Sequence, residues 1–204
     1  MIRTLVLATH NAKKLAELRR IVANSGLTVA VLGLDDVEPY PEPPETERTF
    51  EGNALLKART AAAHTGLPAL ADDSGLEVDV LNRMPGVRTA RWAGPAASDE
   101  ENRRLVLAQV HDVPDADRTA RFVAAVALVL PNGYEHVVGD TMEGRLAREE
   151  VGENGFGYDP IFIAEGNDVT NAQLTSDAKD AISHRGKAVR AMVAHIRELN
   201  EEQR

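Results

Sequence analysis

The sequence predicts an α/β fold built on a mixed β-sheet, and three patterns lead to this prediction. Residues 4–8 resemble a strand with an apolar run at 5–8, and a short polar turn and a helical pattern follow, as in a strand, turn and helix unit. Residues 68–71 form a second apolar run, with the length of a buried strand. Between 118 and 142, two strand patterns flank Pro131-Asn132-Gly133, which is typical of an antiparallel hairpin. Because this hairpin interrupts the alternation of strands and helices, we expect parallel and antiparallel pairs in one sheet.

Composition excludes several classes of function. With 204 residues and 43% hydrophobic content, the chain is large enough to bury a core of its own. The net charge of -9 disfavours a nucleic-acid surface, which needs clustered Lys and Arg. The absence of cysteine excludes disulfides and thiolate chemistry, and the six histidines lack a zinc-like spacing. The longest apolar run, 122–130, is too short to span a membrane, so we expect a cytoplasmic protein with no membrane and no nucleic-acid partner.

The first strand leads into a candidate anion site. Thr9-His10-Asn11 forms a polar turn before the first helix, and the amide groups at a helix N-terminus favour anions. Lys13 and Lys14 lie in the first turn, where the helix dipole alone disfavours cations, so they indicate a bound anion. Solvated surface lysines are the alternative.

The second helix carries polar groups toward the second strand. Four prolines make residues 38–44 an extended connector, and a helix then runs to a stop at Gly66. Asn53 and Lys57 are four residues apart and share a face of this helix. Glu45, in the preceding loop, is free to approach the same place. A solvated Lys57 is equally compatible with the pattern.

The second strand meets two carboxylates, Asp72 and Asp73. Acidic residues at the end of a strand lie where open α/β sheets bind ligands. Neighbours in a strand point to opposite faces, so the two act together only if the chain turns, and Ser74-Gly75 supplies residues typical of a turn. One carboxylate is then a candidate to bind a cation or activate water, and the other to orient it. A solvated loop is the alternative.

Two further stretches complete the candidate site. Residues 152–160 place three glycines and a proline around Phe156 and Tyr158, which resembles a platform for a nucleobase, with Asp159 beside it. The alternative is that both aromatic rings pack in the core. Near the C-terminus, Ser183 is a candidate N-cap for a last helix, which places His184-Arg185 in a first turn that cations occupy unfavourably unless a ligand compensates them.

Five segments together resemble the inosine triphosphate pyrophosphatase family, whose members clear deaminated purine nucleotides from the nucleotide pool. The segments are Leu7-Ala8-Thr9-His10-Asn11-Ala12-Lys13-Lys14, Thr49-Phe50-Glu51-Gly52-Asn53-Ala54-Leu55-Leu56-Lys57-Ala58, Ala71-Asp72-Asp73-Ser74-Gly75-Leu76, Gly155-Phe156-Gly157-Tyr158-Asp159-Pro160 and Ser183-His184-Arg185-Gly186-Lys187-Ala188. They occur in the family's order over almost the whole chain. The resemblance implies one pyrophosphatase domain over 1–204, a long mixed sheet flanked by helices, two lobes with a central active-site cleft, and a homodimer.

The resemblance also implies an activity and its residues. The expected reaction is Mg²⁺-dependent hydrolysis of ITP, dITP and XTP to the monophosphate and pyrophosphate. Asp73 is the expected general base, with Asp72 as the other catalytic candidate, and Glu45 and Asp73 are the expected Mg²⁺ ligands. Phe156 is expected to stack on the purine, with Asp159, Lys179 and Arg185 near its polar edge and His184 close to its 6-position. The substrate-binding residues implied are Thr9, His10, Asn11, Ala12, Lys13, Lys14, Asn53, Lys57, Ser74, Phe156, Gly157, Tyr158, Asp159, Lys179, His184 and Arg185.

Two departures from the family pattern stand near the expected metal site. Glu47 occupies a position where relatives have glycine, and Gly52 one where many have glutamate, which removes a possible carboxylate.

Two other functions compete with the purine pyrophosphatase: hydrolysis of modified pyrimidine triphosphates, and a regulatory nucleotide-binding module without turnover. The His184-Arg185 pair favours the purine substrate. Asp72-Asp73 favours catalysis, because a pure binder would not place carboxylates beside a triphosphate without a metal.

Overall fold

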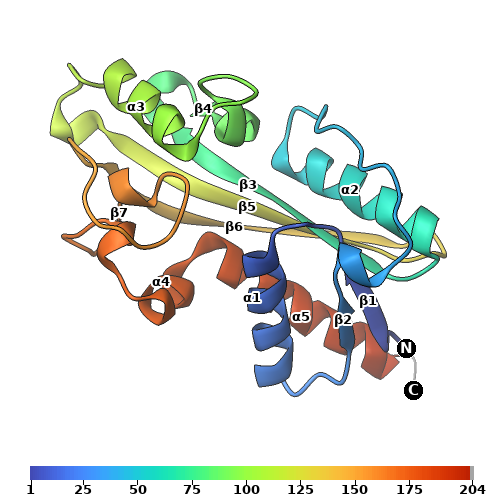
Figure 1. Ribbon diagram of the computed structural model, residues 1–204. Helices are drawn as coiled ribbons and strands as arrows, with labels where there is room; N and C mark the ends of the chain where they lie inside the picture. The colour runs from blue at the N-terminus through green and yellow to red at the C-terminus, as the bar shows by residue number, and fades with distance from the viewer. Residues whose placement is uncertain (203–204) are drawn as a thin grey trace. The chain divides into compact units, whose positions relative to one another are not determined.

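The computed structural model describes residues 1–202 and, among these, every side chain except that of Lys13. Figure 1 shows the arrangement. The strands are β1 (Thr4–Leu7), β2 (Ala30–Leu32), β3 (Ala69–Val78), β4 (Met84–Pro85), β5 (Thr119–Val129), β6 (Glu135–Leu146) and β7 (Phe162–Ala164). The α-helices are α1 (Ala12–Asn24), α2 (Phe50–Thr65), α3 (Asp99–Gln109), α4 (Ser176–Ile182) and α5 (His184–Glu202). Short 3-10 helices lie at Leu34–Asp36, Asp79–Leu81, Gly86–Arg91, Asp115–Asp117, Asp159–Ile161 and Asn171–Gln173.

Within residues 1–202 the strands form one seven-stranded mixed sheet. Its order is β2-β1-β3-β5-β6-β7, and β4 pairs with β3 off this path. Strand β1 is parallel to both β2 and β3, whereas the β3–β4 and β6–β7 pairs are antiparallel. The predicted α/β fold with a mixed sheet is therefore confirmed.

The chain divides into two compact units. Unit 1 comprises Met1–Asp73, Ala124–Asp140 and Arg185–Arg204, and unit 2 comprises Ser74–Val123 and Thr141–His184. Strands β3, β5 and β6 each contribute residues to both units. Neither unit is a continuous stretch of sequence, so the prediction of one domain over 1–204 stays a prediction that an unfolding experiment has to test.

Unit 1 packs its helices on two faces of its strands. Leu5 and Leu7 of β1 alternate with residues of the opposite face and join a buried cluster with Leu18 of α1 and Met192 of α5. Helix α2 buries a row of alanines, among them Ala58, and Figure 1 shows it on the side of the strands away from α1 and α5. Small side chains allow this helix to approach the strands closely, which brings its polar residues near β3.

The ends of α2 follow from its sequence. Thr49 caps the N-terminus, because its Oγ1 accepts a hydrogen bond from the Gly52 amide at 3.0 Å. Gly66 ends the helix in the left-handed region, with φ of +66°, which glycine adopts without steric cost. The predicted stop at Gly66 is therefore confirmed.

Unit 2 has a separate core around β3, β5 and β7. Leu76 and Phe162 are fully buried in it. Arg118 is also buried, and its guanidinium donates to the carbonyls of Val110, Leu146 and Ala147 at 2.5 to 3.1 Å. These bonds connect the end of α3 to the end of β6 and give each of the three guanidinium nitrogens a carbonyl acceptor, as a buried cation requires.

Strand β3 corrects the interpretation of Ser74-Gly75 as a possible turn. The strand does not stop at the two carboxylates but continues to Val78, because Leu76 and Val78 are fully buried in unit 2. Strand β6 likewise extends past the predicted end at 142 to Leu146. The last helix, α5, begins at His184, directly after the predicted N-cap Ser183, and the short helix α4 precedes it.

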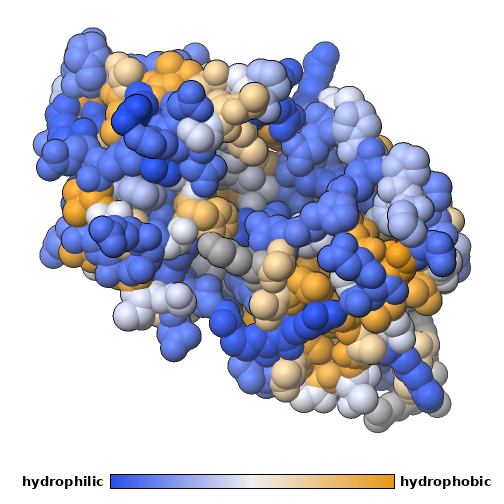
Figure 2. Space-filling model, in the orientation of Figure 1, coloured by the Kyte–Doolittle hydropathy of each residue, from blue (hydrophilic) through white to orange (hydrophobic). Residues whose placement is uncertain are grey.

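The surface in the view of Figure 2 is mostly hydrophilic, with smaller apolar patches. None of the helices in residues 1–202 combines the length and the apolarity needed to cross a membrane. A cavity of about 1010 Å³ lies in unit 1, lined by residues such as Ile2, Val29 and Asn200, and it contains none of the candidate site residues.

Candidate active site

The turn between β1 and α1 is held by its own side chains. Thr9 Oγ1 accepts from the Asn11 amide at 3.2 Å, and Asn11 Oδ1 accepts from the Lys14 amide at 3.3 Å. Asn11 therefore acts as the N-cap of α1, and Lys14 follows in its first turn. His10 is exposed, with its Nε2 2.7 Å from Glu42 Oε1. Ala12 is the first helical residue, and the Lys13 side chain lies outside the described residues.

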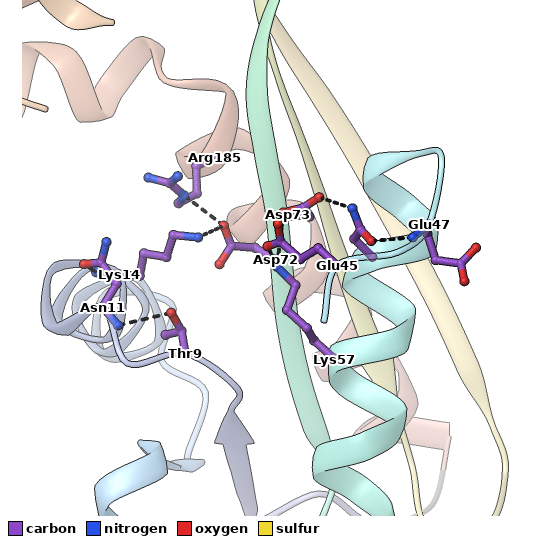
Figure 3. A network of polar contacts seen from close by, with 10 residues as sticks. Thr9, Asn11, Lys14, Glu45, Glu47, Lys57, Asp72, Asp73 and Arg185 are labelled. Carbon is purple, nitrogen blue, oxygen red and sulfur yellow. Dashed lines mark hydrogen bonds and ion pairs between the residues drawn. The ribbon is translucent and has the colours of Figure 1, made fainter. Parts of the chain in front are cut away.

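Asp72 is held between two cations in unit 1. Its Oδ2 accepts from Lys14 Nζ at 2.7 Å and from Arg185 Nε at 3.2 Å, as Figure 3 shows. Asp72 is buried, at 5% exposure. Burial alone would raise the pKa of Asp72, but Lys14 and Arg185 outweigh burial and hold it far below its usual range. Asp72 is therefore a permanent anion that fixes the positions of two cations.

Asp73 faces a different set of partners. Its Oδ1 accepts from Lys57 Nζ at 3.1 Å, and its Oδ2 accepts from Asn53 Nδ2 at 3.0 Å. Lys57 also donates to Glu45 Oε1 at 2.9 Å, so one ammonium joins the two carboxylates (Figure 3). Glu45 thus approaches the face of α2 that Asn53 and Lys57 share, as predicted.

The extended backbone of β3 explains the separation of the two carboxylates. Successive side chains of a strand point to opposite faces, so Asp72 reaches α1 and α5 while Asp73 reaches α2. The pKa of Asp73 is raised, because burial disfavours its charged form and Glu45 adds repulsion, while Lys57 acts in the opposite direction. Of the two neighbours, only Asp73 has an environment that favours taking up a proton.

The Glu45 and Asp73 carboxylates fit a divalent cation of the magnesium type. Both oxygens already converge on one cationic group, the Lys57 ammonium, whose pKa they raise in spite of burial. Within residues 1–202 no three Asp, Glu or His side chains gather closely enough to hold a metal by themselves. Two carboxylates suit Mg²⁺, which is commonly bound by one or two carboxylates together with substrate phosphates.

Glu47 and Gly52, the two departures from the family pattern, lie against each other. A Cβ on Gly52 would come within 2.8 Å of Glu47 Cβ, which is closer than real Cβ atoms approach. The Glu47 amide donates to Asn53 Oδ1 at 3.0 Å, which connects this loop to the amide that binds Asp73. In Figure 3 the Glu47 carboxylate points away from Asp73. Glu47 therefore does not replace the carboxylate that is missing at position 52.

Unit 2 presents Phe156 on a tightly held turn. Phe156 is 41% exposed, and Lys179 Nζ lies over its ring, 4.7 Å from the centroid. The Phe156 amide donates to Asp159 Oδ2 at 2.9 Å, and the same oxygen forms an ion pair with Lys179. An exposed ring backed by a cation is suited to stacking on a flat ligand.

Other residues that were predicted to lie near the purine base pack against, or bond to, neighbours within unit 2. Tyr158 is buried and its hydroxyl donates to the Thr89 carbonyl at 2.8 Å, so this half of the aromatic pair packs in the core. His184 is buried and stacks on Phe122 with centroids 5.0 Å apart. Gly157 donates to Asp99 Oδ2 at 2.8 Å. Ser74 follows Asp73 within β3.

The predicted residues therefore gather into three groups. One joins Lys14, Asp72 and Arg185 in unit 1, where Arg185 pairs with Asp72. The others are Glu45, Asn53, Lys57 and Asp73 in unit 1, and Phe156, Asp159 and Lys179 in unit 2. The expected cleft between lobes stays a prediction.

Two residues that hold the Phe156 turn were not predicted from the sequence. Asp99 is evident only as the first residue after the Ser98 cap of α3, yet it accepts the Gly157 amide. Asn171 lies in a stretch without a recognised motif, yet it is fully buried and donates to Asp159 Oδ1 at 3.3 Å. No local pattern marks either residue: Asp99 and Gly157 are 58 residues apart, and Asn171 lies 12 residues after Asp159.

Comparison with known proteins settles the family. The sequence profile of the Ham1 family matches residues 5–195. The chain belongs to the Ham1 family. The dITP/XTP pyrophosphatase of Nocardia farcinica is 58% identical over 98% of this chain and 97% of its own length. That of Streptomyces coelicolor is 52% identical over 96% of this chain and 95% of its own. The predicted family and enzyme class are thereby confirmed.

Solved structures agree with this assignment to the Ham1 family. The nucleoside-triphosphatase, or dITP/XTP pyrophosphatase, of Mycobacterium abscessus is 53% identical, covers 93% of this chain and 98% of its own, and has a TM-score of 0.79. A Ham1 protein from Coxiella burnetii is 41% identical, covers 97% of this chain and 100% of its own, and has a TM-score of 0.88. The fold described above is thus that of the family's solved members.

Proposed function

We propose that this protein hydrolyses the non-canonical purine nucleotides dITP, ITP and XTP to the monophosphate and pyrophosphate, and so cleanses the nucleotide pool. The observation that carries the proposal is the division of the Asp72-Asp73 pair into an anion fixed by two cations and a carboxylate of raised pKa. Relatives of 50 to 58% identity named dITP/XTP pyrophosphatase support the substrate class. A cytoplasmic location follows from this substrate.

Asp73 is the general base of the proposed reaction. A water oxygen attacks the α-phosphorus, its proton passes to Asp73, and the bond from the α-phosphorus to the bridging oxygen breaks, so that pyrophosphate leaves. A base needs a pKa closer to the working pH than a free carboxyl has, and the raised pKa of Asp73 meets this condition. Asp72 cannot serve, because its two cations make protonation costly. Asn53 holds Asp73 by its Oδ2 and orients it.

Glu45 and Asp73 would hold the Mg²⁺ ion. When bound, the ion would neutralise charge on the phosphates and stabilise charge that develops on the leaving pyrophosphate. Lys57 balances the negative charge of the Glu45 and Asp73 carboxylates in this structure. When a metal ion takes the place of the Lys57 ammonium between them, Lys57 would turn toward the phosphates. The residues present fit the ion, and their chemistry selects a hard, oxygen-binding cation.

Lys14, Arg185, Lys57 and the polar turn of Thr9 and Asn11 would bind the triphosphate. Lys14 stands in the first turn of α1, where its charge and the helix N-terminus act on the same anion. Asp72 holds Lys14 and Arg185 in position before the substrate arrives, so little side-chain ordering remains to be done on binding.

Phe156, Lys179 and His184 would select the base. Stacking on Phe156 accepts any purine, so discrimination depends on polar groups that pair with an oxygen at the 6-position and are left unpaired by adenine. A pyrophosphatase for modified pyrimidines and a module without turnover remain the competing functions, and the named relatives of this family favour neither.

A product analysis tests the proposed reaction. Phosphorus NMR of ITP treated with the protein and Mg²⁺ should show IMP and pyrophosphate. Formation of IDP and orthophosphate would place the attack at the γ-phosphorus and contradict the proposal. In ¹⁸O-labelled water the label should enter IMP and not pyrophosphate.

We also propose a homodimer. Sedimentation equilibrium should give twice the chain's 22.1 kDa at micromolar concentration. A mass equal to that of one chain over the whole concentration range would contradict this part of the proposal without affecting the chemistry.

A further inference from the structure

Asp159 is buried beneath the exposed Phe156 ring and accepts hydrogen bonds from three segments. The carboxylate is only 2% exposed, and it accepts from the Phe156 amide, from Lys179 and from Asn171 Nδ2. These donors come from a loop, from α4 and from the 3-10 helix at Asn171–Gln173. Asp159 thus uses its oxygens for internal bonds that connect three segments, and its position determines theirs.

The backbone of the turn at Phe156 packs tightly against the Asp159 carboxylate. Gly155 has φ of +79°, and a Cβ there would lie 2.2 Å from Asp159 Oδ2. The backbone therefore runs directly against the carboxylate. Lys179 both pairs with Asp159 and lies over the Phe156 ring, so a displacement of Asp159 moves the ring and the cation together.

Asn171 lies in the segment 170–172, which is hydrogen-bonded to the loop that carries Phe156. The Ala172 carbonyl accepts from the Asn154 amide at 3.0 Å, and Thr170 Oγ1 donates to the Val151 carbonyl at 2.6 Å. Gly152 fits closely here, because a Cβ on it would come within 2.6 Å of the Ala172 carbonyl. Asn171 is the residue of this segment whose side chain reaches Asp159.

The buried amide of Asn171 is bonded through its Nδ2 and not through its Oδ1. Its exposure is 0%, and its Oδ1 has no hydrogen-bond partner among residues 1–202. Burying an acceptor without a partner costs free energy, and an apolar side chain of the same size would avoid that cost. What the amide supplies, and an apolar residue would not, is the bond from Nδ2 to Asp159.

We propose that Asn171 is a positioning residue for base recognition, which holds Asp159 and through it presents Phe156 and Lys179 to the purine. The proposal rests on the proposed function, because it deepens the role of the same base-side residues. The proposed role of Asn171 involves no contact with the nucleotide. It determines how well the stacking surface is ordered before the base arrives.

The test compares Asn171→Leu, which keeps the size and removes the amide, with wild type. The dissociation constant of IMP should rise about tenfold, and the ratio of the IMP and AMP constants should move toward one by at least fivefold. The inhibition constant of inorganic tripolyphosphate, which has no base, should not change. The melting temperature should fall, because the buried Asp159 Oδ1 loses its Asn171 donor. Thr170→Val is the matched control, which removes a bond to the same loop and should also lower stability, but without changing the IMP to AMP ratio.

Two results would overturn the inference. One is an unchanged IMP to AMP ratio in Asn171→Leu, and the other is an equal weakening of tripolyphosphate binding. Asn171→Ala provides the same comparison if the leucine variant does not fold. Exchange of the Phe156 amide with solvent should accelerate at least tenfold in the variant, while the amides of β5 stay protected. These binding measurements do not depend on turnover, whereas the proposed function fails separately if wild type releases no pyrophosphate from ITP.

Discussion

Asp72 and Asp73 are neighbours in the chain with opposite tendencies to bind protons. Two cations lower the pKa of Asp72, while burial and Glu45 raise that of Asp73. The residue pattern alone predicted that both carboxylates matter without distinguishing their roles, and the family resemblance predicted Asp73 as the base. The partners that distinguish them, Lys14 and Arg185, lie 58 and 113 residues from Asp72, and no local pattern predicts contacts at such separations.

The pH dependence of turnover should report Asp73. A base must be unprotonated, so kcat/KM should fall as the pH falls through the raised pKa, at a pH above the value of about 3.9 for a free aspartate. Glu45→Gln removes the repulsion from Glu45 and should shift this acid limb to lower pH. A pH–rate profile with no acid limb in either protein would remove Asp73 from the role of base.

Asp72 should contribute stability that depends on pH. Its folded pKa is below the unfolded value of about 3.9, so the contribution is fully present above that pH and is lost as the pH falls below it. Asp72→Asn leaves two cations without their anion and should cost about 3–5 kcal/mol at pH 7. Urea unfolding of both proteins at pH 7, 4 and 3 measures this. A difference that is the same at all three values would contradict the ion-pair account.

At the scale of elements, β3 shows what short motifs predict and what they miss. The apolar run before Asp72 correctly predicts a buried strand, and Asn53 and Lys57 correctly predict a shared helix face. The Ser74-Gly75 pair suggested a turn, but Leu76 and Val78 continue the strand because both are buried in unit 2. Tertiary burial outweighed local turn preference, and only the structure could show that.

The contact between Glu47 and Gly52 predicts a coupling between two substitutions. Replacing glycine by alanine inside a helix usually stabilises by about 1 kcal/mol. Gly52→Ala should not stabilise the wild type, because its Cβ would be 2.8 Å from Glu47 Cβ. In a Glu47→Gly background the gain should appear. Glu47→Ala keeps the Cβ and serves as the control, in which the gain should stay absent. Additive free energies of unfolding in all backgrounds would show that the two positions are independent.

At the scale of the molecule, the two units share strands, and this predicts one unfolding transition. Because β3, β5 and β6 run through both, neither unit keeps its sheet if the other unfolds. Trp92, the single tryptophan, lies in unit 2, so its fluorescence reports that unit, while far-UV circular dichroism reports helices of both. The two signals should coincide in a urea titration. Separate midpoints would show that the units are independent domains.

The mixed sheet was predictable from the antiparallel hairpin, since Pro131-Asn132-Gly133 marks it in the sequence. The division into units was not, because it separates residues that are adjacent in the chain, such as Asp73 and Ser74. Hydrophobic patterning shows that these strands are buried but does not show which core each half of a strand joins.

Pyrophosphate release from ITP, XTP, GTP and ATP, with and without Mg²⁺, in wild type and in Asp73→Asn, tests whether Asp73 is the base of a purine pyrophosphatase. We expect Mg²⁺-dependent turnover of ITP and XTP, weak turnover of GTP and ATP, and a loss of at least about 10²-fold in the variant. Tight nucleotide binding without turnover, or a variant as active as wild type, would contradict the assignment of Asp73 as the base of a pyrophosphatase.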